Sequence, residues 1–424
     1  MKFSKPPGLP PGLRMLCAKE NSKGSGLSLG LRMLCSVAAL CLSTALGQIA
    51  EAKPAKAELS PPVSRALLQL ESYIQTEMRK HGYPGCAVAV VHQGKVVLLK
   101  GFGNTKKGSV ERINADTVFQ LGSVSKPVTA TLIARLQQKG SLKVTAPITR
   151  YIQSFLAKDF EQNRNLKIWH LLSHTTGWGR HGFNQQIESK VTRPLLLKNL
   201  QKSLPLGLVG RHYDYHNVAF SLIEDVVTSA EKQPFTAVLK NELFKPLNMY
   251  RTTSSWGELM AQKNRAWPHV RDKNNRIRPL SQYSKHYYEA VCSAAGINSS
   301  VRDMSAFLRL QMGDFPQILG KDSLRIFHSP HIKAPDAQPR FQEYRDKGVS
   351  SYYGLGWRLV DIGGERIVYH GGWLKGFTNF LAFLPKHQVG IVILHNAESR
   401  FAIKASMSFF DAYLKLKQEG QILE

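Results

Sequence analysis

The sequence has few cysteines, and most of them lie near its start. Five occur among 424 residues, and three of these, Cys17, Cys35 and Cys41, fall within the first 52. A scaffold held together by many disulfides is therefore excluded. We expect Cys86 and Cys292 to be buried thiols, with a disulfide between them as the alternative. Cysteine and histidine do not recur with zinc-ligand spacing, and H-E-x-x-H is absent, so we expect no metal and no other cofactor.

Acidic residues are also scarce. Asp and Glu total 30 against 57 Lys and Arg, which gives a formal net charge of +27. The basic residues are scattered and no nucleic-acid-binding motif accompanies them, so nucleic acid is not an expected partner. Two interpretations of the charge remain, attraction to an anionic cell envelope or solubility alone.

Long apolar runs are missing as well. The longest candidate, 33–46, is short for a membrane span and follows a leader that carries Lys and Arg. Ala50-Glu51-Ala52 then provides small residues on both sides of a cleavage pattern. Residues 1–52 are therefore predicted to be a signal peptide, so we expect an exported protein, periplasmic or secreted. The alternative is an uncleaved N-terminal segment that anchors the protein to a membrane.

After the leader, 53–60 is predicted to be a linker and 61–424 one domain. Apolar residues recur with helical spacing in 62–80 and 402–416. We expect an α/β fold, an α+β sandwich in which strands from both chain ends form one antiparallel sheet flanked by helices, with a helical subdomain over about 127–312. The ranges predicted to be strands are 86–91, 96–99, 358–369, 377–384 and 390–394.

The most informative pattern in the sequence is the pair Ser123 and Lys126. Side chains three residues apart on a helix lie on one face, one turn apart. Gly122 allows a tight turn before them, and apolar residues with helical spacing follow. A lysine whose pKa is lowered by burial or by nearby positive charge can take the serine proton, which makes the hydroxyl a nucleophile for carbonyl carbon. The alternative is an ordinary helix-capping serine with a solvated lysine.

Two later groups of residues can complete such a site. Tyr215 and Asn217 precede a helical pattern, and they supply a phenol that can exchange protons and an amide that can donate and accept. His370-Gly371-Gly372 is followed by Trp373. Glycines let a substrate approach a strand backbone closely, and a backbone amide there can face an oxyanion. Taken singly, each group also fits a structural role, as a packed tyrosine or as a glycine-rich hairpin with a surface histidine.

In this order, the three groups resemble the motifs of the serine β-lactamase and penicillin-binding-protein superfamily. The resemblance is closest to the class C β-lactamase-related serine hydrolases, and it covers nearly all of the chain after the leader. It implies the β-lactamase/transpeptidase-like fold with an inserted helical subdomain, and an acyl-enzyme mechanism without a cofactor. Further segments that share the resemblance are 101–104, 170–177, 244–249, 294–297 and 353–357.

The resemblance also implies roles for the first two groups. Ser123 corresponds to the acylated nucleophile and Lys126 to its proton partner. Tyr215 corresponds to a tyrosine that shuttles protons, and Asn217 to an asparagine that orients the lysine and the substrate amide. Lys126 and Tyr215 stay alternatives for the general base.

The third group is implied to bind substrate through His370, Gly372 and Trp373, with an oxyanion hole formed by the backbone N–H groups of Ser123 and Trp373. His370 stands where efficient β-lactamases of this group have lysine, and a neutral histidine attracts a substrate carboxylate less. Asn396, just after the last predicted strand, is a further candidate for holding that carboxylate.

Two other histidines need an interpretation. His216 stands between Tyr215 and Asn217, where the family often has serine or alanine. His174 suggests a Ser-His-Asp triad, but the resemblance makes it part of a loop that braces the helical subdomain. G-x-S-x-G is absent, which counts against an α/β-hydrolase.

The expected function is that of an exported serine hydrolase that cleaves amide or ester bonds, in the manner of a D,D-peptidase or an esterase. A true β-lactamase is the first alternative. A penicillin-recognising envelope-binding protein without turnover is the non-enzymatic one. The expected partner is a small-molecule or peptide substrate, which includes cell-wall peptides.

Overall fold

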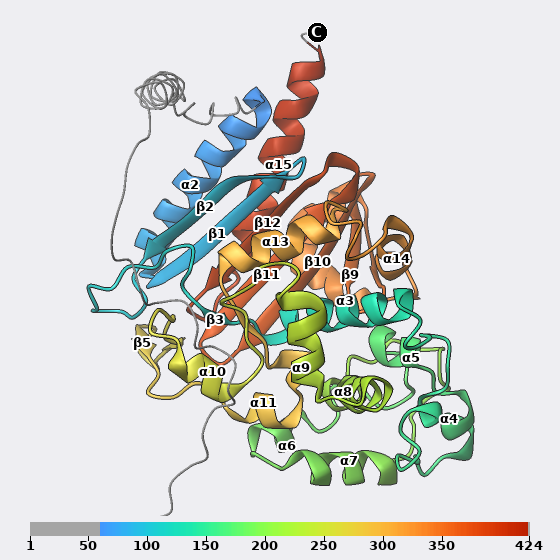
Figure 1. Cartoon of the computed structure of the whole chain (residues 1–424). Helices are drawn as coiled ribbons and strands as arrows, with labels where there is room; N and C mark the ends of the chain where they lie inside the picture. Colours follow the sequence, from blue (N-terminus) through green and yellow to red (C-terminus); the bar gives the residue numbers. More distant parts are fainter. Residues whose placement is uncertain (1–59, 423–424) are drawn as a thin grey trace, which may run out of the picture. The chain divides into compact units, whose positions relative to one another are not determined.

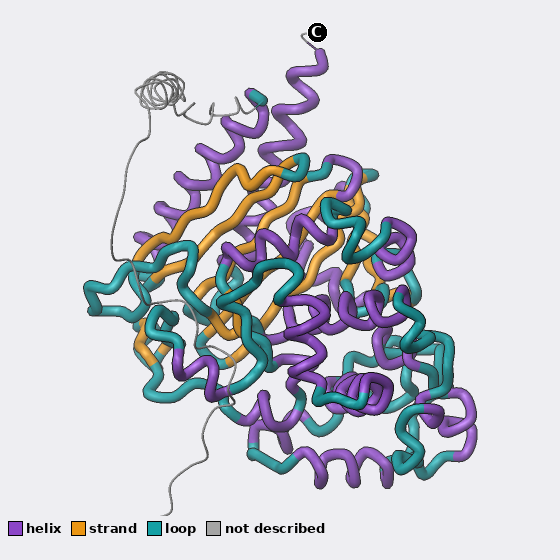
Figure 2. Tube along the Cα trace, viewed as in Figure 1, coloured by secondary structure: helices purple, strands orange, loops and turns teal. Residues whose placement is uncertain are grey.

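Residues 60–422 are described by a computed structural model, in which helices cover both faces of an antiparallel sheet (Figures 1 and 2). The predicted signal peptide, 1–52, and all but the last residue of the predicted linker lie outside the described residues.

The main sheet is built from strands of both ends of the described chain. The strand order is β2-β1-β12-β11-β10-β9-β8-β7, and every neighbouring pair is antiparallel. β1 pairs with β12 in a register that sets Cys86 opposite His395. The expectation of one antiparallel sheet from both chain ends is confirmed. The strands are β1 Gly85–His92, β2 Lys95–Gly103, β7 Ile332–Lys333, β8 Val349–Tyr353, β9 Arg358–Ile362, β10 Glu365–Leu374, β11 Phe377–Leu384 and β12 Val389–His395.

The structure differs from the prediction among the late strands. The pattern predicts a single strand over 358–369, whereas the chain reverses at Gly363 and Gly364, which have positive φ angles of 58° and 81°. The range therefore contains β9 and the first half of β10. Two adjacent glycines are a known hairpin signal, but the apolar alternation that continues on both sides hides the turn. β7 and β8 have no counterpart in the prediction.

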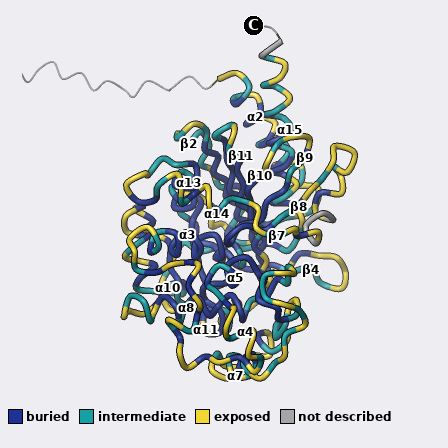
Figure 3. The backbone as a smooth tube through the Cα atoms, turned by 90° about the vertical axis from the view of Figure 1, so that its right-hand side faces the viewer, coloured by how far each residue is buried: buried dark blue, intermediate teal, exposed yellow. Residues whose placement is uncertain are grey.

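Two hydrophobic cores lie on opposite faces of the sheet. Along β1, Ala87, Ala89 and Val91 belong to one core and the alternate residues to the other, as the period of two along a strand requires. One face is covered by α2 (Pro61–His81) and α15 (Phe401–Ile422), which pack on each other (Figure 1). The other face is covered by α13 (Val301–Gln311) and by other helices of the segment between β2 and β7. Figure 3 shows the buried backbone concentrated in the sheet and the helices against it.

The part of the chain between β2 and β7 is mostly but not wholly helical. It contains two small two-stranded sheets, in which β3 (Phe119–Gln120) pairs with β6 (Asn298–Ser299) and β4 (His269–Arg271) pairs with β5 (Ile277–Pro279). The helices of this part are α3 Ser125–Gln138, α4 Phe160–Asn165, α5 Ile168–Ser173, α6 Asn184–Glu188, α7 Arg193–Lys202, α8 Asn217–Glu231, α9 Phe235–Leu239, α10 Trp256–Ala261, α11 His286–Ala290, α12 Cys292–Ala295, α13 as above and α14 Lys321–Phe327.

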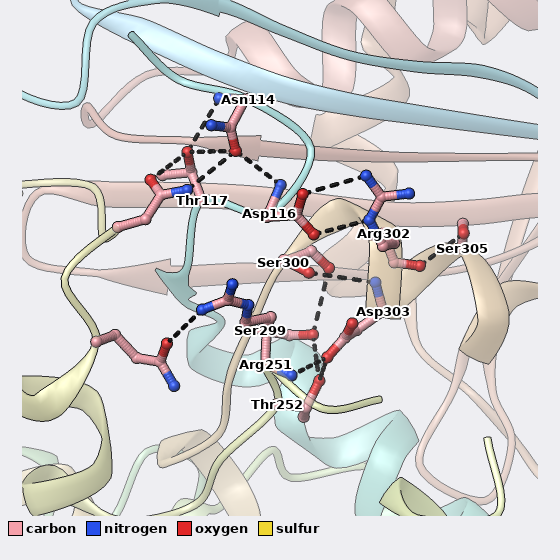
Figure 4. Close-up of polar contacts among 12 residues, drawn as sticks. Asn114, Asp116, Thr117, Arg251, Thr252, Ser299, Ser300, Arg302, Asp303 and Ser305 are labelled. Carbon is pink, nitrogen blue, oxygen red and sulfur yellow. Dashed lines mark hydrogen bonds and ion pairs between the residues drawn. The ribbon is translucent and has the colours of Figure 1, made fainter. Parts of the chain in front are cut away.

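A polar network fixes the segment that leads into β3 (Figure 4). On α13, Arg302 donates to both carboxylate oxygens of Asp116, at 2.7 and 3.1 Å. The next residue of that helix, Asp303, accepts a hydrogen bond of 2.8 Å from the hydroxyl of Thr252. Because β3 precedes Ser123 by three residues, this network anchors the chain just before the candidate nucleophile.

The two cysteines within the described range are free and buried, as expected for Cys86 and Cys292. Among residues 60–422 no helix is long and apolar enough to cross a membrane.

Candidate active site

Ser123 stands in a short 3₁₀ turn, η1 (Gly122–Val124), that leads into α3. Gly122 has a φ angle of 57°, and a Cβ atom there would lie 3.0 Å from the backbone nitrogen of Trp373. Glycine therefore serves both the left-handed turn and the close approach of a strand. Ser123 is partly exposed and lines a cavity of about 440 Å³. Tyr215, Asn217, His370, Gly372 and Trp373 line the same cavity.

Lys126, one turn after Ser123, is completely buried. Its Nζ atom donates to Oδ1 of Asn217 at 2.7 Å and to the backbone carbonyl of Ala294 at 3.0 Å. Burial lowers the pKa of Lys126 well below its usual value, and the nearby charge of Arg358 lowers it further. The lowered pKa favours the neutral form of the amine, which is the form that can accept a proton.

A second asparagine orients Asn217, the first residue of α8. The side-chain nitrogen of Asn217 donates to Oδ1 of Asn184 at 3.1 Å. With its NH₂ group engaged there, the amide presents its oxygen to Lys126. Asn184 also lines the cavity, and the sequence motifs do not include it.

The carbonyl that accepts from Lys126 is held in place by a largely buried acid. Glu224 accepts from the backbone N–H of Ser293 at 2.9 Å and from its hydroxyl at 2.8 Å. The carbonyl of Ser293 in turn accepts from the hydroxyl of Thr129 on α3, at 2.8 Å. Arg193 lies 3.5 Å from Glu224, and the side chains of both are less than one-fifth exposed. These contacts fix α12 against α3 and so position the carbonyl of Ala294.

The ring of Tyr215 is contacted by the amine of Lys126 and by the ring of His174. The Nζ atom of Lys126 lies 4.5 Å from the centre of its ring, and the ring of His174 packs on it at 4.3 Å. His174 is buried, and its Nδ1 atom accepts from the backbone N–H of His216 at 3.2 Å. This contact set agrees with the expected bracing role of His174. His216 is itself buried and caps α8, since its Nδ1 atom accepts from the N–H of Ala219 at 3.1 Å.

The glycine-rich motif lies within β10, and the turn comes later, at 375–376. His370 is therefore not a surface residue. It is 1% exposed, and its Nε2 atom lies 3.0 Å from the hydroxyl of Tyr353. Burial lowers the pKa of His370 well below its usual value, and the charges of Arg358 and Lys126 add to this effect. The ring is thus neutral near neutral pH and offers a substrate carboxylate no charge.

Strand β10 presses directly on the turn that carries Ser123. A Cβ atom on Gly372 would lie 2.0 Å from the backbone oxygen of Leu121, so only glycine fits. On the neighbouring strand, the side chain of Asn379 donates to the carbonyls of Gln120 and Leu121, at 2.8 and 3.1 Å. The backbone of Trp373 is thereby held next to that of Gly122, the residue before Ser123.

Two residues, Arg358 and Asn396, differ from what the sequence indicates. Arg358 is 5% exposed, and its guanidinium lies 5.2 Å from the ring centre of Tyr215 and 5.5 Å from that of Tyr353. The sequence marks Arg358 only as an arginine at the start of an apolar strand. Asn396 is the wrong candidate for a carboxylate. It is fully buried, and its side chain donates to the carbonyl of Thr105 at 2.9 Å.

The described part of the chain, 60–422, brings no three His, Cys, Asp or Glu residues together in a way that could hold a metal ion.

A sequence model of the beta-lactamase family matches residues 70–412. The chain belongs to this family. Among curated relatives, Protein flp of Staphylococcus aureus (strain MW2) is 23% identical over 346 residues, covering 79% of this chain and 64% of that protein. A beta-lactamase of Yersinia enterocolitica is 26% identical over 352 residues, covering 75% of this chain and 84% of the other. The chain thus spans less than two thirds of the length of the flp relatives.

The fold is also that of solved structures. The octameric penicillin-binding protein homologue from Pyrococcus abyssi superposes with a TM-score of 0.72 at 22% identity, covering 82% of this chain and 77% of that one. The family resemblance that the sequence motifs indicate is confirmed, as is the β-lactamase/transpeptidase-like fold.

Proposed function

We propose that the protein is an exported serine hydrolase that cleaves amide or ester bonds through an acyl-enzyme, with the specificity of a D,D-peptidase or an esterase. The observation that carries the proposal is the buried amine of Lys126, one helical turn from Ser123. It donates to a backbone carbonyl and to Asn217, which lines the same cavity as Ser123. Export rests on the basic, apolar leader in 1–52.

In the first step, the hydroxyl of Ser123 gives its proton to the neutral amine of Lys126, or to Tyr215 if that phenol is ionised. The oxygen of Ser123 then bonds to the carbonyl carbon of the substrate. The carbonyl oxygen becomes an oxyanion that the backbone N–H groups of Ser123 and Trp373 stabilise, by roughly 3 kcal/mol per well-placed donor. The tetrahedral intermediate collapses, and the leaving alcohol or amine takes the proton. Water then attacks the acyl-enzyme, which releases the acid and restores the serine.

The state of His370 favours ester substrates that lack a carboxylate over β-lactams, which carry one. Its buried, neutral ring lacks the charge with which a lysine at this place would attract a carboxylate. The similarity to the Yersinia beta-lactamase supports β-lactam hydrolysis as the second candidate. A binding protein without turnover would have no need for a buried amine held by two acceptors beside the serine.

A panel of substrates tests these alternatives on one preparation of the full chain. Nitrocefin, p-nitrophenyl esters and D-Ala-D-Ala peptides report the three activities. Ser123→Ala should abolish turnover and the mass increase that a fluorophosphonate gives. Ser229→Ala is the matched control, because Ser229 and Lys232 repeat the same spacing away from the cavity. Equal turnover in both variants would refute the mechanism, and labelling of Ser123 without product would favour the binding protein.

A further inference from the structure

Large hydrophobic side chains are exposed on two segments of the chain that are hydrogen-bonded to each other. In the loop that follows α7, Leu204, Leu206 and Leu208 are 59%, 84% and 69% exposed. Leu156 and Phe160, just before and at the start of α4, are 58% and 72% exposed. We call these five residues the leucine patch. Patches of this kind on a folded protein commonly mark an interaction surface.

The two parts of the patch are joined by hydrogen bonds. The backbone N–H of Lys158 donates to the carbonyl of Gln201 at 2.7 Å, and the side chain of Gln201 donates to the carbonyl of Ser154 at 3.1 Å. The end of α7 is thereby attached to the chain that leads into α4. In two views, α4 and α7 lie side by side at the end of the molecule away from α2 and α15 (Figures 1 and 3).

The leucine-bearing loop is held in a fixed conformation. The N–H groups of Leu206 and Gly207 both donate to the carbonyl of Gly177, at 2.8 and 3.3 Å. Leu204, Leu206 and Leu208 alternate with Pro205 and Gly207, so the exposed residues are every second one of the loop. The fold therefore holds three aliphatic side chains out into solvent.

The chain around these leucines is basic. From 189 to 213 it contains five Lys or Arg residues and no Asp or Glu. Lys198, Lys202 and Arg211 are exposed in this range, while Arg193 is paired with Asp225 at 2.5 Å. The α4 side is mixed in charge, since the exposed Lys158 and Arg164 flank Asp159 and Glu161, and Asp159 accepts from the backbone N–H of Gln162. The cationic part of the surface is therefore the α7 side. Aliphatic side chains that project from a cationic surface match an anionic bilayer, which offers an apolar interior beneath negative headgroups.

We propose that the leucine patch docks on a lipid bilayer that carries anionic headgroups. Protein interfaces rely on tyrosine, tryptophan and arginine anchors in shaped pockets, and leucine is under-represented among their hot spots. A bilayer accepts projecting aliphatic side chains without a shaped pocket. Docking here would also bring the catalytic cavity near the lipid surface, because Gly177 precedes Arg180, which lines the cavity, by three residues. The proposal does not depend on the hydrolytic activity.

The first test is sedimentation of the full chain with vesicles. Vesicles of phosphatidylglycerol and phosphatidylcholine in equal parts should bind the protein, and added salt should weaken binding. A variant with L204S, L206S and L208S should bind at least about tenfold more weakly. The matched control carries L68S, V110S and Y250S, which remove exposed residues elsewhere, 71%, 92% and 76% exposed, and should bind like the parent. Equal binding by all three chains would overturn the proposal.

The second test measures contact of the loop itself with lipid, independently of any lipid binding by the predicted leader. Leu206→Trp places an indole in the patch and Val110→Trp places one far from it in the chain. Vesicles with brominated acyl chains should quench the added fluorescence of the first variant and not that of the second. Absence of added quenching at residue 206 would overturn the proposal. So would leucine-dependent dimers in lipid-free buffer without quenching, because the patch would then be covered by a second copy of the chain.

Discussion

Nζ of Lys126 lies 2.7 Å from Oδ1 of Asn217, although 91 residues separate them in the sequence. The contact joins the start of α8 to α3, the helix that follows the candidate nucleophile. A burial-lowered pKa on the amine makes this pair sensitive to any nearby charge.

The rate of acylation should rise with pH and then level off, because Lys126 accepts a proton only as the neutral amine. The charge of Arg358 helps to lower the pKa of Lys126. Arg358→Met should therefore move the rising limb of the kcat/KM profile, measured with a p-nitrophenyl ester, to higher pH. Arg400→Met, another change at the cavity wall, is the control. A limb that stays in place or moves to lower pH in Arg358→Met would contradict the assignment of Lys126.

Gly372→Ala should slow acylation by about a hundredfold or more, because its Cβ would lie 2.0 Å from the oxygen of Leu121 and displace the turn of Ser123. Gly371→Ala is a closely matched control, since the nearest atoms to its Cβ are 3.8 Å away. The rate of fluorophosphonate labelling, followed by mass spectrometry, measures the effect. Similar rates for the two variants would mean that the strand does not constrain the nucleophile.

Glu224→Ala should lower the free energy of unfolding by about 2–3 kcal/mol, because Arg193 loses a largely buried partner and Ser293 loses two hydrogen bonds. Urea unfolding measures this change. Arg325→Ala removes a surface ion pair, 75% and 92% exposed, and should leave the urea midpoint unchanged. Should both variants unfold at the same midpoint, the network around Glu224 contributes nothing to stability.

Acid should destabilise the protein well above the pH at which carboxylates titrate. Burial lowers the pKa of His216, His328 and His395 from 6.5 to about 3, and that of His170 and His269 to about 4. The unfolded chain binds protons at these histidines from about pH 6.5 downward, whereas the folded chain does not, so stability falls as pH falls. Urea midpoints at several pH values between 7 and about 4 measure the slope, and His328→Gln should reduce it. A stability that rises on acidification in this window would exclude buried neutral histidines.

Local patterns predict the elements near both chain ends well. The helical spacing in 62–80 corresponds to α2, and the strands predicted over 86–91 and 96–99 correspond to β1 and β2. The adjoining hairpin at Gly363 is hidden, because apolar alternation on both sides of the two glycines continues as it would in a single strand. Periodicity describes which face of a strand is buried, and it does not by itself locate a reversal.

The residues of the candidate site could be recognised from motif order, whereas the residues that hold them in place could not. The acceptors of Lys126 include a backbone carbonyl, which every residue possesses, so no side chain marks Ala294. Glu224 and Asn184 come from different helices and meet the site only through tertiary packing. The sequence wrongly predicts that Asn396 binds a carboxylate. Its place at a strand end predicts where the residue lies, but not whether its side chain faces the cavity or the backbone of a neighbouring loop.

The pairing of β1 with β12 constrains the order in which the protein can mature. Cys86 meets His395 only after more than three hundred residues have been synthesised between them. Until then β1 is paired with β2 alone, and β11, which pairs with β10, has no partner on its other side. Emergence of the final strand and helix therefore completes both the sheet and the wall of the candidate site, because Arg400, Ala402 and Ile403 line the same cavity as Ser123. A chain truncated near its end should keep Ser123 but lose this wall.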